Sequence, residues 1–163
     1  MSTRLPPASP VSSSRFRARR PVALGLALCI ALLVLRESRA AQPASEFRVI
    51  VNTQNPTSAV KRELLAGLFL KKATRWPTGE PVAPVDLRPA AKAREAFSTA
   101  ILKRPVAAVR QYWTQRTFSG RDLPPAELES DEAVVRYVTT HPGAVGYVSA
   151  SANTSGTKPL EVH

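Results

Sequence analysis

Segments with strand-like and helix-like patterns of apolar and polar residues follow one another along this chain. Residues 47–51 alternate between apolar and polar positions and are rich in β-branched side chains, as expected for a strand. Residues 82–87 and 144–148 predict two further strands, and residues 159–162 predict an edge strand. A sheet of modest size is therefore expected.

Four helices are predicted between these strands. The first begins after Thr57 or Ser58, because either side-chain oxygen can accept a hydrogen bond from the first helical turn. The remaining helices are predicted at 92–102, 105–118 and 130–141. Strands that alternate with helices predict an α/β domain, with a mixed sheet flanked by helices.

Residues 1–40 have the three parts of a signal peptide. Several arginines precede an almost unbroken apolar run at 22–35, and small residues stand at Ser38 and Ala40. The run has the length of a signal-peptide core and is short for a membrane span. We expect cleavage after Ala40, which leaves a domain at 41–163 in the periplasm. The alternative is an uncleaved signal that anchors the protein in the inner membrane.

The net charge of the predicted mature domain is smaller than that of the whole chain. The chain carries a formal charge of +11. Residues 41–163 hold 16 Lys and Arg residues against 11 Asp and Glu residues, which leaves about +5. A mildly basic surface favours an anionic small molecule, and export of the domain argues against nucleic acid as a partner.

Three segments resemble the second lobe of periplasmic phosphate-binding proteins of ABC transporters. The most specific is 64–76, in which an amphipathic helix runs through Phe-Leu-Lys-Lys into a turn with a buried Trp. The strand and Asn-Pro turn at 47–56 and the segment His-Pro-Gly-Ala-Val-Gly-Tyr-Val at 141–148 complete the match. The resemblance implies a single small lobe of a type II periplasmic binding protein that binds phosphate or a related oxyanion.

The anion site that the resemblance implies is altered in this chain. In the family the strand ends in Arg, and a Ser-Gly-Thr run then opens a helix whose N–H groups hold the phosphate. Here Asp86 stands in place of that Arg, and Ala90 and Ala91 replace Ser and Gly. Arg88 and Lys92 still supply positive charge. Asp86, Arg88 and Lys92 are therefore candidates for an oxyanion site, and the alternative is that Asp86 and Arg88 are ordinary solvated loop residues.

Three more residues are candidate ligands. Arg121 follows Ser-Gly, whose backbone can turn N–H groups outward, although a surface loop explains the same residues. Thr53 and Ser58 lie near the expected start of the first helix, where capping alone also accounts for them.

No catalytic or metal-binding pattern is present in the sequence. The two histidines, His141 and His163, form no pair at ligand spacing, and the only cysteine lies in the leader. We therefore expect neither an enzyme nor a cofactor. The leading hypothesis is an exported oxyanion-binding domain whose cleft is completed by a second copy or a partner protein, with membrane contact only through the signal segment. The alternative is a periplasmic interaction module that kept the scaffold and lost the solute.

Overall fold

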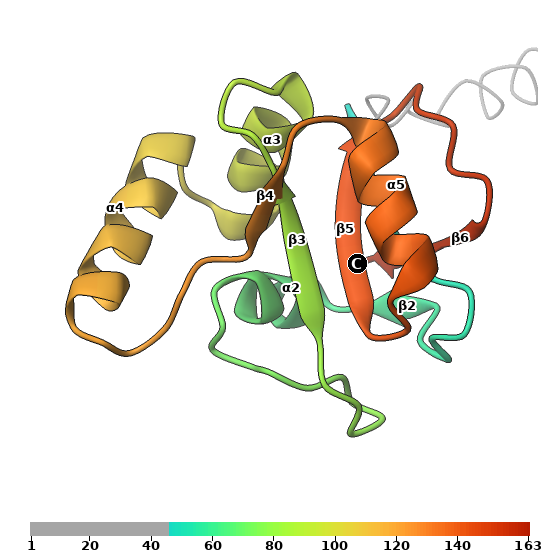
Figure 1. The fold of residues 1–163 in the computed structure, drawn as a ribbon, viewed down its shortest axis with the longest axis horizontal. Coiled ribbons are helices and arrows are strands. Elements are labelled where there is room, and N and C mark those ends of the chain that lie inside the picture. Colours follow the sequence, from blue (N-terminus) through green and yellow to red (C-terminus); the bar gives the residue numbers. More distant parts are fainter. Residues whose placement is uncertain (1–45) are drawn as a thin grey trace, which may run out of the picture. The chain divides into compact units, whose positions relative to one another are not determined.

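A five-stranded mixed sheet forms the centre of the computed structural model, which describes residues 46–163 (Figure 1). The strand order is β4-β3-β5-β1-β6. β3 runs parallel to β4 and β5, and β1 runs antiparallel to β5 and β6. The bounds are β1 (Phe47–Asn52), β3 (Ala83–Leu87), β4 (Ala126–Leu128), β5 (Ala144–Ser149) and β6 (Thr157–Pro159). The predicted α/β architecture with a mixed sheet is confirmed, whereas the signal peptide predicted at 1–40 lies outside the described residues.

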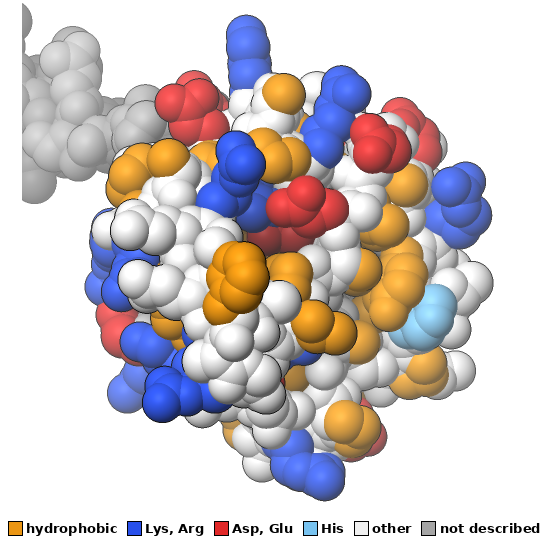
Figure 2. Space-filling model, turned by 60° about the vertical axis from the view of Figure 1, so that its left-hand side comes forward, with side chains coloured by type: hydrophobic (Ala, Val, Ile, Leu, Met, Phe, Trp, Pro, Cys, Tyr) orange, Lys and Arg blue, Asp and Glu red, His pale blue; other side chains and the backbone are white. Residues whose placement is uncertain are grey.

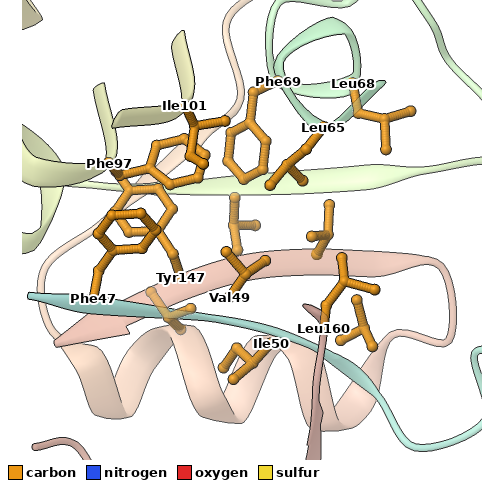
Figure 3. Close-up of a cluster of buried hydrophobic side chains, with 14 of the residues drawn as sticks. Phe47, Val49, Ile50, Leu65, Leu68, Phe69, Phe97, Ile101, Tyr147 and Leu160 are labelled. Atoms are coloured by element: carbon orange, nitrogen blue, oxygen red, sulfur yellow. The ribbon is translucent and has the colours of Figure 1, made fainter. Parts of the chain in front are cut away.

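Helices cover both faces of this sheet. α5 (Asp131–Thr140) lies on one face, and α2 (Arg62–Phe69) lies on the other together with α3 (Lys92–Phe97) and its π-helical extension η1 (Ser98–Leu102) (Figures 1 and 3). α4 (Val106–Phe118) follows η1 beside the sheet. None of the described helices is long and apolar enough to cross a lipid bilayer.

Side chains on the two faces of β1 contact the helical layers on opposite sides of the sheet. The amide of Asn52 donates to the backbone oxygens of Val138 and Thr139 in α5, at 2.8 and 2.9 Å. Phe47 points to the opposite face, where its ring lies 5.5 Å from the ring of Phe97. Successive side chains of a strand point to opposite sides, so one short strand fastens both helical layers.

An aromatic cluster fills the space between the sheet and the α2–α3 layer (Figure 3). The rings of Phe97 and Tyr147 are stacked, with centroids 3.9 Å apart and planes at 6°. Phe69 packs beside them, 4.6 Å from Phe97. This packing holds α3 in place against β5.

Trp76 joins the two most specific segments of the sequence pattern. Its side chain is 2% exposed, as expected from the sequence, and its Nε1–H donates to the backbone oxygen of Gly143 at 3.1 Å. The turn after α2 and the turn before β5 are therefore fastened to one another.

The start of the first helix differs from the prediction. Helix α2 begins at Arg62 without a side-chain cap. Ser58 instead accepts a hydrogen bond from the Glu161 N–H at 2.9 Å, and Ala59–Val60 (β2) pairs with Glu161–Val162 (β7). The predicted cap at Thr57 or Ser58 is wrong, because pairing with the end of the chain holds this segment extended.

The other helix starts agree more closely with the sequence. Ser130 caps α5, its Oγ accepting from the Ala133 N–H at 3.3 Å. Pro105 occupies the capping position itself and Val106 begins α4, one residue later than predicted. Strand β4, which no pattern predicted, adds an edge to the sheet beside β3.

Candidate functional site

Three parallel strands, β4, β3 and β5, end at one edge of the sheet. Ligands of open α/β sheets bind outside the carboxyl ends of such strands. The loop from Arg88 to Ala91, between β3 and α3, lies at this edge. The site is therefore described from the end of β3 outward.

Asp86 is buried within β3, and its Oδ1 has three partners. The residue is 3% exposed. Its carboxylate forms an ion pair with Arg94 and accepts hydrogen bonds from the Tyr147 hydroxyl and from the N–H of Leu87, the latter at 3.1 Å. The interpretation of Asp86 as a solvated loop residue is therefore wrong, and its Oδ1 is already engaged by the protein.

Arg94, on α3, contacts acidic side chains of the neighbouring strands β3 and β4. Asp86 and Glu127 are register partners on β3 and β4, so their side chains share a face. Arg94 binds Asp86 through Nη1, and its Nη2 lies 3.5 Å from Oε1 of Glu127. Nη1 also donates to the backbone oxygen of Leu87 at 2.7 Å. One buried guanidinium thus balances two carboxylates that would otherwise repel one another.

Burial dominates the acid–base properties of this cluster. It raises the pKa of Asp86 from its ordinary 3.8 to about 6, although the charge of Arg94 and the hydrogen bond from Tyr147 act in the opposite direction. Burial also raises the pKa of the Tyr147 hydroxyl, helped by the neighbouring Asp86 charge. Tyr147 therefore stays neutral and serves as a hydrogen-bond donor.

The loop after β3 carries the free positive charge at this edge. Arg88 and Lys92 are both exposed. The only ion pair of Arg88 among the described residues is a loose one with Glu129 at 3.9 Å. The backbone N–H groups of Lys92 and Ala93 have no acceptor within residues 46–163, because the start of α3 lacks a side-chain cap. Two cations and two free donors therefore lie on one short segment.

The remaining predicted ligands do not join this group. β1 runs antiparallel to β5, so Thr53 and Ser58, beyond the end of β1, lie at the opposite edge of the sheet from Leu87. At about 3.3 Å per residue the two edges are roughly 15 Å apart, too far for one small anion to touch both. Arg121 is exposed in the loop between α4 and β4. The six predicted residues thus do not form one site.

Arg94 is the central residue that sequence reasoning missed. Its position gave a usable signal, because Ala93, Arg94, Phe97 and Ser98 make one buried stripe along α3 and η1. An Arg on the apolar stripe of a helix that follows an Asp-containing strand indicates a buried ion pair. Among residues 46–163, no three His, Cys, Asp or Glu side chains gather closely enough to hold a metal ion.

Comparison with known proteins identifies the fold. No family model and no curated protein matches the sequence. The solved structures that match include a protein from Clostridium perfringens described as a phosphate ABC transporter substrate-binding protein with bound phosphate, at a TM-score of 0.57 and 15% identity. An ABC-type phosphate transport receptor from Vibrio cholerae matches at 0.56 and 17%, and PstS from Borrelia burgdorferi at 0.55 and 12%.

These matches extend over most of this chain but only part of the other proteins. Each covers 72% of this chain, and 44%, 46% and 47% of the Clostridium, Vibrio and Borrelia chains respectively. The chain therefore spans less than half the length of the structures it matches. At such low identity the likeness establishes the fold alone: residues 46–163 share the α/β architecture of one lobe of these proteins.

Proposed function

We propose that this chain is an exported solute-binding domain that holds a small oxyanion, with phosphate as the first candidate, at the loop between β3 and α3. One observation carries the proposal. Arg88, Lys92 and two unpaired backbone N–H groups lie together at the carboxyl ends of the parallel strands, in a fold shared with phosphate receptors.

The buried cluster beneath the loop supports this assignment. Asp86 stands where the resemblance expects an arginine, and an unpaired carboxylate there would repel an anion. Arg94 neutralises it inside the protein, and Tyr147 donates a further hydrogen bond. The positive charge of Arg88 and Lys92 is thus left to act on a ligand outside the sheet.

The second wall of the cleft has to face this loop for tight binding. The matched part of this chain covers less than half of each receptor. We therefore propose that a second copy of the chain, or a partner protein, supplies the opposing surface. Export through the segment at 1–40 would place the domain in the periplasm, either free after cleavage or anchored to the inner membrane.

A second candidate function rests on a different observation. The carboxylate of Asp86 forms an ion pair inside the protein and is not available to a solute. Two large apolar side chains, Phe118 and Leu123, are 88% and 66% exposed. These features favour a periplasmic interaction module that retained the scaffold without its solute. Such a module would bind protein and ignore phosphate.

Thermal melting of the full chain with and without millimolar phosphate separates the two functions. A ligand at 100 times its dissociation constant adds about 2.7 kcal/mol, which raises the melting temperature of a domain of this size by roughly 5–15 °C. Under the oxyanion proposal Arg88→Gln should remove most of the shift, whereas Arg136→Gln, an exposed change on α5, should leave it intact. No shift with phosphate or sulfate would contradict the oxyanion proposal and leave the interaction module.

A further inference from the structure

A pocket of about 370 Å³ lies beside the buried cluster, on the side of the molecule that carries α4. Its walls come from β3, β4, α3, α4 and the loop at Pro124 and Pro125. Arg88 and Lys92 do not line it, so the pocket is separate from the proposed oxyanion site. Its volume falls in the range of small-molecule sites and exceeds what a single inorganic ion needs.

Charges of both signs border this pocket. Asp86, Arg94, Arg110 and Glu127 all line it, which makes its formal charge close to zero. Figure 2, which brings the α4 side forward, shows basic, acidic and apolar side chains next to one another on this face. A pocket balanced in this way gives no net attraction for a simple anion, and it suits a ligand that carries both charges itself.

Two of these groups have unused hydrogen-bonding capacity. The Nε–H of Arg94 is buried and has no partner in the described part of the chain, which is costly for a charged group. Arg110 is exposed and forms no ion pair within residues 46–163. Arg110 therefore offers accessible donors suited to a carboxylate, and the buried positive charge of Arg94 adds to the attraction.

The acceptor for a positive group is Glu127. Its side chain is 45% exposed, and only one of its oxygens, Oε1, approaches Arg94, at 3.5 Å. The second oxygen remains open to a ligand ammonium. A carboxylate site and an ammonium site are thus present within one small cavity.

Apart from the hydroxyl-bearing Thr114 and Thr117, the rest of the pocket wall is apolar. Trp113, Phe118, Pro124 and Pro125 line it, and Phe118 is 88% exposed on its rim. An aromatic side chain left so open gains from contact with an apolar group of a ligand.

We propose that this pocket binds a free amino acid with an apolar or aromatic side chain. Its carboxylate would lie against Arg110, within the field of the buried Arg94 charge. Its ammonium would lie against Glu127, and its side chain against Phe118 and Trp113. The assignment does not depend on oxyanion binding at the β3–α3 loop.

Isothermal titration of the full chain with L-phenylalanine tests the proposal. We expect saturable binding that weakens at least tenfold in phenylalaninamide, which lacks the carboxylate, and in 3-phenylpropionate, which lacks the ammonium. Arg110→Gln and Glu127→Gln should each weaken L-phenylalanine binding at least tenfold, while Arg136→Gln on α5 should not change it. Both substituted positions are exposed, so the variants should fold.

The contrary outcomes are equally specific. No binding of L-phenylalanine would overturn the proposal. Binding of 3-phenylpropionate as tight as that of L-phenylalanine would also overturn it, because the pocket would then recognise an apolar acid. Binding that survives both Arg110→Gln and Glu127→Gln would place the amino acid elsewhere.

Discussion

The guanidinium of Arg94 lies against the carboxylate of Asp86, and both side chains are almost completely buried, at 2% and 5% exposure. The pair joins α3 to β3 beside the loop that carries Arg88 and leads to Lys92, the first residue of α3. The Tyr147 hydroxyl and Glu127 complete it from β5 and β4. Three strands and one helix therefore meet at this one contact.

Replacing Arg94 with methionine should destabilise the domain strongly. At pH 8 the ionised Asp86 would be left buried without its cation, which costs about 3–5 kcal/mol of unfolding free energy. Urea denaturation measures the loss. The matched control is Arg88→Gln, because the pair of Arg88 with Glu129 is 3.9 Å long and exposed at 59% and 86%. That change should stay within about 0.5 kcal/mol, and equal losses in the two variants would contradict the account.

Stability should depend on pH through Asp86. Its pKa in the folded protein is about 6, above the ordinary 3.8. The folded state therefore holds the proton more tightly, and the resulting stabilisation is complete below about pH 3.8 and is lost as the pH rises through 6. The shift corresponds to about 3 kcal/mol at most.

Comparison with Asp86→Asn isolates this contribution. The unfolding free energy of the unmodified chain, taken relative to that of Asp86→Asn, should fall between pH 4 and pH 8 in urea denaturation. Parallel pH profiles for the two proteins would show that the carboxyl group titrates normally in the folded state.

The sequence predicted the central layers better than it predicted the edges. The strands at 47–51, 82–87 and 144–148 carry clear apolar patterns, because each is packed by helices on at least one face. The edge strand predicted at 159–162 is confirmed in part as β7, whereas its partner β2 has only two residues and depends on pairing about one hundred residues away, which local patterns do not encode. β4 also gives no strand pattern in the sequence, since its three residues are mostly exposed at the edge of the sheet.

The candidate site was predicted only in part, for a similar reason. Arg88 and Lys92 follow directly from their place after a strand. The burial of Asp86 depends on Tyr147, which lies 61 residues further along the chain, and on the inward face of α3. The pattern of a strand alone does not reveal that one of its carboxylates is paired with a buried arginine of the next helix.

Glycine substitutions should separate a crowded position from an open one. A Cβ at Gly146 would lie 2.6 Å from Cγ1 of Val134 and 3.0 Å from Cγ2 of Val85, so Gly146→Ala should cost about 1–3 kcal/mol. A Cβ at Gly67, within α2, would meet only Cβ of Ala73 at 3.9 Å. Gly67→Ala should therefore stabilise the domain by about 0.5–1 kcal/mol. Chemical denaturation of both variants checks the packing of α5 on β5, and a harmless Gly146→Ala would contradict it.

The capping serine of α5 offers a smaller effect. Ser130→Ala removes the acceptor for the Ala133 N–H and should lower the unfolding free energy by about 1 kcal/mol. Ser58→Ala serves as the control, since Ser58 takes part in pairing with β7 through its backbone and caps no helix. The same denaturation series measures both, and a loss confined to Ser58→Ala would reverse the assignment of the caps.

Titration of the ¹⁵N-labelled full chain with phosphate, followed by the backbone amide spectrum, tests the central claim most directly. The oxyanion proposal predicts that the largest saturable shifts fall on the amides of Lys92 and Ala93, while those of Thr53 and Ser58 at the other edge of the sheet stay unchanged. An unaltered spectrum at millimolar phosphate, or shifts centred away from the β3–α3 loop, would contradict it.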